Sequence, residues 1–141
     1  MSTVLKISDA ASLALHTAAL LAARLDEVQS TRSMAEELDV SEAHLSKVLQ
    51  RLTKVGLVTS VRGAHGGFQL AGDPEEVTLL EVYEAIDGPL RPSACLLGSH
   101  RACDGKGCIL GDLLGSMNDQ VESHFASRRL SDLAEPFKRS G

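Results

Sequence analysis

The sequence predicts a mainly α-helical protein with one small β-hairpin and a long helix near its end. Apolar residues recur at helical spacing in most segments, two short β-branched runs flank a glycine-rich turn, and helical periodicity returns after an aperiodic stretch. The 141 residues are 43% hydrophobic and 3% aromatic, which suits an aliphatic core. We see neither a run of about 18 apolar residues nor a secretion signal, so we expect a cytoplasmic protein without a membrane partner.

Three helices are expected before the hairpin. Residues 8–25 carry Leu and Ala at helical spacing. Ser30 or Thr31 is expected to cap a short second helix, and Ser41 a third, which Gly56 would end in a left-handed conformation. The third helix has leucines on one face and polar and basic residues on the other. Two short helices joined by a tight turn, the second one basic, form a helix-turn-helix pattern.

A glycine-rich hairpin follows these helices. Residues 57–61 form a β-branched run, residues 62–67 a turn, and residues 68–70 a return strand. Such a hairpin beside a recognition helix is a wing. We expect Arg62 and His65 at its tip to enter a DNA minor groove, where narrow A·T tracts concentrate negative potential. Ordinary turn chemistry would also explain its glycines.

The charge distribution favours a nucleic-acid partner, although the chain carries a net charge of −5. Residues 43–71 contain four Lys or Arg and no Asp or Glu. Phosphates respond to this local field more than to the total charge. On charge alone, Arg51 is expected to contact a phosphate. A basic helix face that is merely solvated is the alternative explanation.

The second half of the chain predicts two further helices around an aperiodic loop. Thr78 and Glu81 form a capping box, and the helix they open ends at Gly88. From Ile109 an apolar stripe resumes, which we expect to pack on a second copy of the chain, or alternatively within one chain. Three parts result: a winged helix-turn-helix domain (1–88), a cysteine-containing sensor loop (89–108, the cysteine loop), and a dimerisation helix with a tail (109–141).

The cysteine loop holds all three cysteines, Cys95, Cys103 and Cys108, with the spacing C-x7-C-x4-C. Thiols clustered in a reducing compartment are more often ligands or redox groups than structural disulfides. Thiolates are the usual ligands of iron–sulfur clusters, and three of them leave one position for another residue. A zinc site completed by His100 and a reversible disulfide remain open as alternatives.

No enzyme signature accompanies these features. The sequence contains no G-x-x-x-x-G-K phosphate loop, no G-x-S-x-G elbow and no H-E-x-x-H metal motif. We therefore expect a protein that is not an enzyme and has no catalytic residues.

The order of elements, the segment RGAHGGFQLA at 62–71, the helix at 78–88 and the cysteine trio together resemble the IscR/NsrR family of winged-helix transcriptional regulators. The resemblance covers nearly the whole chain. It implies a homodimer on a near-palindromic operator of double-stranded DNA, with one recognition helix in each of two major grooves. It assigns groove contacts to Ser41, Ala43, His44, Ser46 and Lys47, and wing contacts to Arg62 and Gly63.

The resemblance also implies a cofactor on the cysteine loop. Members of this family either hold a [2Fe-2S] or [4Fe-4S] cluster, and sense redox poise, nitric oxide or iron–sulfur status, or work without a cluster. Three cysteines favour the first type, with Cys95, Cys103 and Cys108 as ligands. For the fourth ligand the resemblance favours His16 of the partner subunit, ahead of His100, Asp104 or water. The chain would thus be a repressor or activator; a cluster-free regulator that responds to zinc, thiol oxidation or a protein partner is the alternative.

Overall fold

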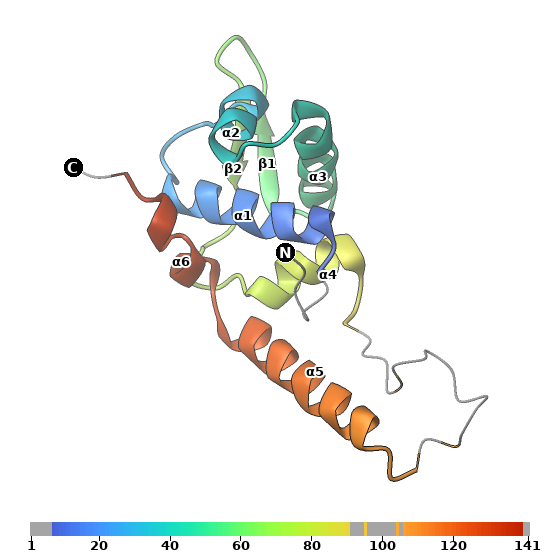
Figure 1. Ribbon diagram of the computed structural model, residues 1–141. Coiled ribbons are helices and arrows are strands. Elements are labelled where there is room, and N and C mark those ends of the chain that lie inside the picture. Colours follow the sequence, from blue (N-terminus) through green and yellow to red (C-terminus); the bar gives the residue numbers. More distant parts are fainter. Residues whose placement is uncertain (1–6, 91–94, 96–103, 105, 140–141) are drawn as a thin grey trace.

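The computed structural model describes residues 7–90, 95, 104 and 106–139, and the elements in these ranges confirm the predicted fold class. The chain is mainly helical, with a single two-stranded hairpin in the described residues (Figure 1). The elements are α1 (Asp9–Ala23), α2 (Thr31–Leu38), α3 (Glu42–Lys54), β1 (Val58–Val61), β2 (Gly67–Leu70), α4 (Leu79–Asp87), α5 (Ile109–Ser127), α6 (Leu130–Leu133) and the 3-10 turn η1 (Glu135–Phe137).

Serine side chains start the first three helices. The hydroxyls of Ser8, Ser30 and Ser41 each accept a hydrogen bond from the backbone N–H three residues on, at 3.0 to 3.1 Å. Each cap satisfies one N–H that the helix cannot pair internally. Gly56 follows α3 with φ +84°, as its predicted place beyond the helix end requires.

Helix α1 forms the centre of the core. It lies between the helix-turn-helix pair and α4 (Figure 1), and it packs against α3, α4 and α6. Five of its seven alanines are buried, which lets these neighbours approach closely: Ala11, Ala14, Ala18, Ala19 and Ala22. Large aliphatic side chains from α1, α3 and α4 fill the rest: Leu20, Leu21, Leu45, Leu49, Leu52 and Val82.

The hairpin is fastened to the helices by a third segment. Strands β1 and β2 pair antiparallel from Val58↔Leu70 to Val61↔Gly67, and Gln29 adds an isolated bridge to Phe68. A Cβ on Gly67 would lie 2.3 Å from the carbonyl oxygen of Gln29. Only glycine therefore lets the segment before α2 approach β2 this closely.

Helix α5 is packed at one end and exposed at the other. Near its C-terminal end Phe125 is buried against α4, with its ring centroid 5.8 Å from that of Tyr83. Its first turns extend away from the body (Figure 1), and Ile109, Leu110 and Leu113 are 79%, 48% and 56% exposed. The apolar stripe thus packs within the chain near Phe125 but remains uncovered in its first half.

The chain before α4 meets the chain after α5. Thr78 and Arg129 form an isolated bridge, flanked by hydrogen bonds from Leu79 N to Arg128 O (3.1 Å) and from Leu130 N to Val77 O (2.9 Å). The capping box of Thr78 and Glu81 is present as predicted. No helix in the described ranges is both long and apolar enough to cross a membrane.

Candidate functional site

The exposed face of α3 carries the side chains predicted to contact a DNA groove. Leu45, Leu49 and Leu52 are fully buried, so the opposite face turns outward. On its first turns Ala43 and Lys47 are exposed, and His44 and Ser46 are half-buried. Ser41 is exposed at the N-cap, where its oxygen accepts from His44 N while its own O–H is left to donate elsewhere.

The hairpin tip presents the predicted wing residues. Arg62, Gly63 and His65 are all exposed, and Gly63 has φ +119°, a conformation that suits glycine. The tip and the beginning of α3 lie toward the same end of the molecule (Figure 1). The two sets of predicted DNA contacts therefore lie toward one end of the fold.

Arg51 lies apart from this end. It is near the C-terminal end of α3, and its Nη2 donates a hydrogen bond to the carbonyl oxygen of Ile86 in the last turn of α4. The charge of Arg51 predicts a phosphate contact, and no sequence pattern indicates this hydrogen bond. The two residues are 35 positions apart, so no local pattern signals the pair.

The cysteine loop is described only in part. Cys95 and Cys108 are half-buried, and Cys108 is the N-cap of α5. Cys103 and the alternative ligand His100 lie outside the described residues. Asp104 is exposed and its Oδ1 accepts from Lys106 N at 2.9 Å. Within the described ranges, no three His, Cys, Asp or Glu side chains gather into a group fit for a metal ion.

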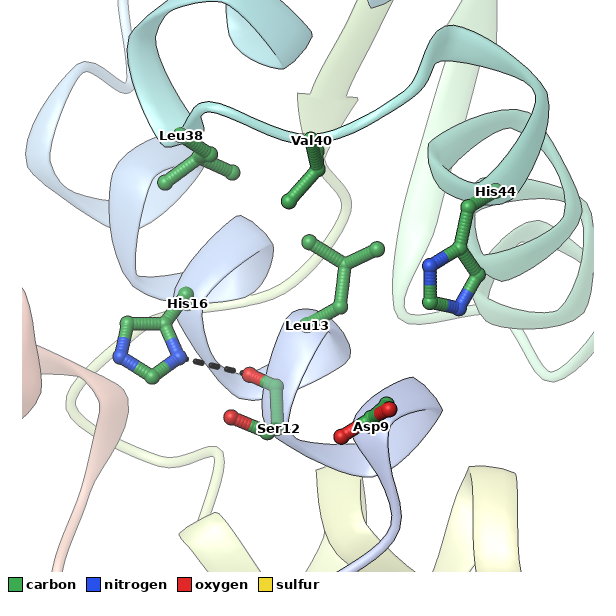
Figure 2. A pocket seen from close by; sticks show the side chains of 7 residues that line it. All are labelled: Asp9, Ser12, Leu13, His16, Leu38, Val40 and His44. Carbon is green, nitrogen blue, oxygen red and sulfur yellow. Dashed lines mark hydrogen bonds between the residues drawn. The ribbon is translucent and has the colours of Figure 1, made fainter. Parts of the chain in front are cut away.

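His16 lies on the exposed side of α1, beside a hollow of about 410 Å³ (Figure 2). Its Nδ1 is 2.7 Å from the carbonyl oxygen of Ser12, and its ring meets the edge of Phe137 with centroids 6.4 Å apart. Because a carbonyl only accepts, Nδ1 carries the proton in this hydrogen bond, and in the neutral ring Nε2 is the nitrogen with the lone pair. The hollow is lined by Asp9, Ser12, Leu13, His16, Leu38, Val40 and His44.

An ion pair with one buried partner, Arg24, holds α2 against the end of α1. Arg24 donates two hydrogen bonds to Glu37, at 2.7 and 2.6 Å, and the arginine side chain is only 7% exposed. The hydrogen bond from Arg24 holds the pKa of Glu37 below its ordinary value, and the same bond raises the pKa of Arg24. This pair fixes the first helix of the helix-turn-helix to the core.

Comparisons with known proteins agree with this architecture. Residues 7–136 match the family model Rrf2, described as an iron-dependent transcriptional regulator. The chain is 30% identical over 105 residues to the HTH-type transcriptional regulator CymR of Bacillus subtilis, covering 74% of this chain and 71% of that protein. It is 31% identical over 100 residues to IscR of Photorhabdus laumondii, covering 71% and 60%.

A solved structure shows the same fold. The structure of CymR, the global cysteine regulator of B. subtilis, superposes with a TM-score of 0.78 at 29% identity, covering 94% of this chain and 98% of that one. The family match spans most of the chain, including the helix-turn-helix, the hairpin and α5. This protein therefore belongs to the Rrf2 family of transcriptional regulators.

Proposed function

We propose that the protein acts as a homodimer that binds a near-palindromic operator, with a DNA affinity set by an iron–sulfur cluster on the cysteine loop. One observation carries the DNA-binding part. The exposed face of α3 and the hairpin tip lie toward one end of the fold, in a segment (43–71) without a single acidic residue. A local cationic surface of this kind suits a phosphate backbone.

The first turns of α3 would enter the major groove. Ser41, Ala43, His44, Ser46 and Lys47 would face base edges and phosphates there, while Arg62, Gly63 and His65 would contact the neighbouring minor groove. The cap at Ser41 leaves its O–H for a phosphate oxygen. The φ of Gly63 favours glycine, and the lack of a side chain there would let the backbone approach DNA closely.

The exposed start of α5 supports the homodimer. Ile109, Leu110 and Leu113 form an apolar stripe that one chain leaves in water. Burying each side chain on a second copy would contribute about 1 to 2 kcal/mol. A two-fold arrangement of this stripe would also place two recognition helices for two half-sites about one DNA turn apart.

The donor set fits an iron–sulfur cluster. Cys95, Cys103 and Cys108 would hold it, with His16 of the partner subunit as fourth ligand. The Nδ1–H of His16 donates to a backbone carbonyl, which is the usual arrangement of a ligating histidine and leaves Nε2 for the metal. Cys108 stands at the positive end of the α5 dipole, which favours a negatively charged ligand. When bound, such a cluster supplies sensitivity to redox state and nitric oxide.

Regulation would follow from where the cysteine loop is attached. The loop leaves the end of α4 and reaches the start of α5, so ligation through Cys95 and Cys108 acts on both helices. A changed start of α5 would change how two copies pack. The distance between the two recognition helices would change with it. Because the two half-sites of the operator have a fixed spacing, the affinity for DNA would change as well.

A cluster-free regulator of the same fold is the second candidate. The similarity to CymR favours it, since the chain also resembles an oxidised form of Staphylococcus aureus CymR, with a TM-score of 0.73 at 27% identity. In this version, zinc, thiol oxidation or a protein partner would act on the same cysteine loop.

The test is oxygen-free purification with iron, sulfide and zinc analysis, combined with selection of a bound duplex from a random pool. We expect a coloured protein with iron and sulfide in equal amounts, and an affinity for the selected duplex that changes on exposure to air or nitric oxide. Cys103→Ala should abolish the colour. Stoichiometric zinc in a colourless protein would support the second candidate. Failure to enrich any duplex would refute DNA binding altogether.

A further inference from the structure

The last turn of α4 is tied to two other helices. Arg51 of α3 donates to the carbonyl oxygen of Ile86, and the hydroxyl of Ser8, at the start of α1, donates to Asp87 Oδ1 at 2.7 Å. The last carbonyls of a helix have no partner within it. Arg51 therefore supplies a donor that α4 itself lacks, because its last turn contains no basic residue and ends in Asp87.

Arg51 differs in this respect from Lys47, another cation of the exposed α3 face. Lys47 lies one turn earlier, toward the end of α3 that carries the proposed groove contacts, and within the described residues its amine makes no ion pair. Arg51 lies toward the opposite end, where α3 approaches α4. A guanidinium bound to a helix C-terminus is favourable through both the hydrogen bond and the helix dipole.

We propose that Arg51 is a positioning residue, which sets the orientation of α3 by tethering it to the end of α4 and does not contribute a phosphate contact. This inference rests on the proposed function, since it concerns how α3 meets DNA. It also gives α4 a role in recognition, because its last turn would orient α3. The chain continues from this turn through Gly88 toward Cys95 in the cysteine loop.

The length of α3 makes its orientation sensitive to this tether. The helix has 13 residues, and at about 1.5 Å per residue it is about 20 Å long. A small rotation at its anchored end moves the first turns by a larger distance. Base contacts depend on that placement, whereas attraction to phosphates depends mainly on charge. Loss of the tether should therefore lower specificity more than general affinity.

The experiment compares two variants of Arg51 with one of Lys47 on two duplexes. Arg51→Met removes the charge and the hydrogen-bond donors but keeps a side chain of similar length. Arg51→Gln removes the charge and keeps an amide donor. Lys47→Gln is the control, because it removes one charge from the same helix. The duplexes are one enriched by the wild-type protein from a random pool and a shuffled one of equal composition. Affinity is measured across a salt series, and thermal unfolding confirms that each variant is folded.

We expect Arg51→Met to lower the ratio of affinities for the selected and shuffled duplexes roughly tenfold, with an unchanged salt slope. Arg51→Gln should fall in between, because it can still donate to Ile86. Lys47→Gln should reduce the salt slope by about one for each subunit's lost phosphate contact. A purely structural role would lower the unfolding temperature but leave the ratio unchanged.

Two results would overturn the inference. In the first, Arg51→Met lowers the salt slope as much as Lys47→Gln does and leaves the ratio of affinities for the selected and shuffled duplexes unchanged. This result would make Arg51 a phosphate contact. The other is an unchanged ratio in both Arg51 variants. If Arg51→Met does not fold, Arg51→Gln decides on the same two measurements. A wild-type protein that enriches no duplex would refute the proposed function, and this inference with it.

Discussion

Gln29 and Phe68 exchange two backbone hydrogen bonds, with N···O distances of 3.0 and 2.8 Å, that join the segment before α2 to the second strand of the hairpin. Gln29 is itself buried, at 4% exposure. The hairpin is therefore held by the helix-turn-helix as well as by its own turn. This contact fixes where Arg62 and His65 are presented relative to α3.

Gly67→Ala should loosen this attachment. The new Cβ would lie 2.3 Å from Gln29 O, so one of the two backbones must move and their hydrogen bonds weaken. We expect a loss of about 2 kcal/mol in the free energy of unfolding, measured by chemical denaturation. Gly72→Ala is the control, because its Cβ would meet only Val77 Cγ2 at 3.5 Å. Equal stability of the two variants would contradict the tight fit at Gly67.

Arg62→Ala should weaken operator binding roughly tenfold at fixed salt and reduce the salt slope by about one per subunit. The reason is that Arg62 is exposed at the hairpin tip and would lose a contact to the groove. Fluorescence anisotropy on the selected duplex measures both quantities. Arg128→Ala removes another exposed charge, at the end of α5, and should change neither quantity. Unchanged operator binding by Arg62→Ala would show that the wing does not contact DNA.

Leu113→Glu should convert the proposed dimer to a monomer. Leu113 is 56% exposed in one chain, so the charge costs little there, whereas burying it against a second apolar stripe is costly. Sedimentation equilibrium measures the change, and far-ultraviolet circular dichroism checks that the helices persist. Leu25→Glu, at a 45% exposed position after α1, is the control and should remain dimeric. A dimeric Leu113→Glu would place the interface elsewhere.

Glu37→Gln should cost about 1 kcal/mol at neutral pH, a value reduced for screening because the Glu37 side chain is 37% exposed. The pKa of Glu37 is lowered from its ordinary 4.5. Its stabilising effect is thus complete above that value and is lost as the pH falls through the lower folded pKa.

Denaturation of wild type and Glu37→Gln across acidic pH checks this expectation, since the two curves should converge at low pH. Glu36→Gln serves as control, because Glu36 pairs with Arg32 at 3.5 Å with both side chains largely exposed. That change should cost only a few tenths of a kcal/mol. A Glu37→Gln cost that persists unchanged at low pH would mean that the ion pair is not its source.

Local chemistry made much of the fold predictable. Caps at Ser41 and Thr78 and the glycine at 56 are short-range signals, and the structure contains all three. The Gln29 bridge and the Arg51–Ile86 bond were not predicted, because they join residues far apart in sequence. No spacing rule connects such positions.

The candidate site divides in the same way. The exposed face of α3 followed from the periodicity of its buried leucines. The prediction that Arg51 contacts a phosphate rested on charge alone. Charge does not indicate a hydrogen bond to a carbonyl oxygen of another helix. The cysteine trio remains a prediction, since Cys103 lies outside the described residues and the proposed ligand His16 belongs to a second copy.

The bridge between Thr78 and Arg129 has a consequence for how such proteins diversify. The chain enters α4 and leaves α5 at adjoining positions, while α4 itself packs in the core against α1 and α3. Chain segments whose ends adjoin are the ones most readily replaced as a block. A graft of residues 79–128 from one relative onto another, with the α4 residues that contact α1 and α3 kept, should therefore transfer the response to the signal and preserve the DNA sequence that is recognised.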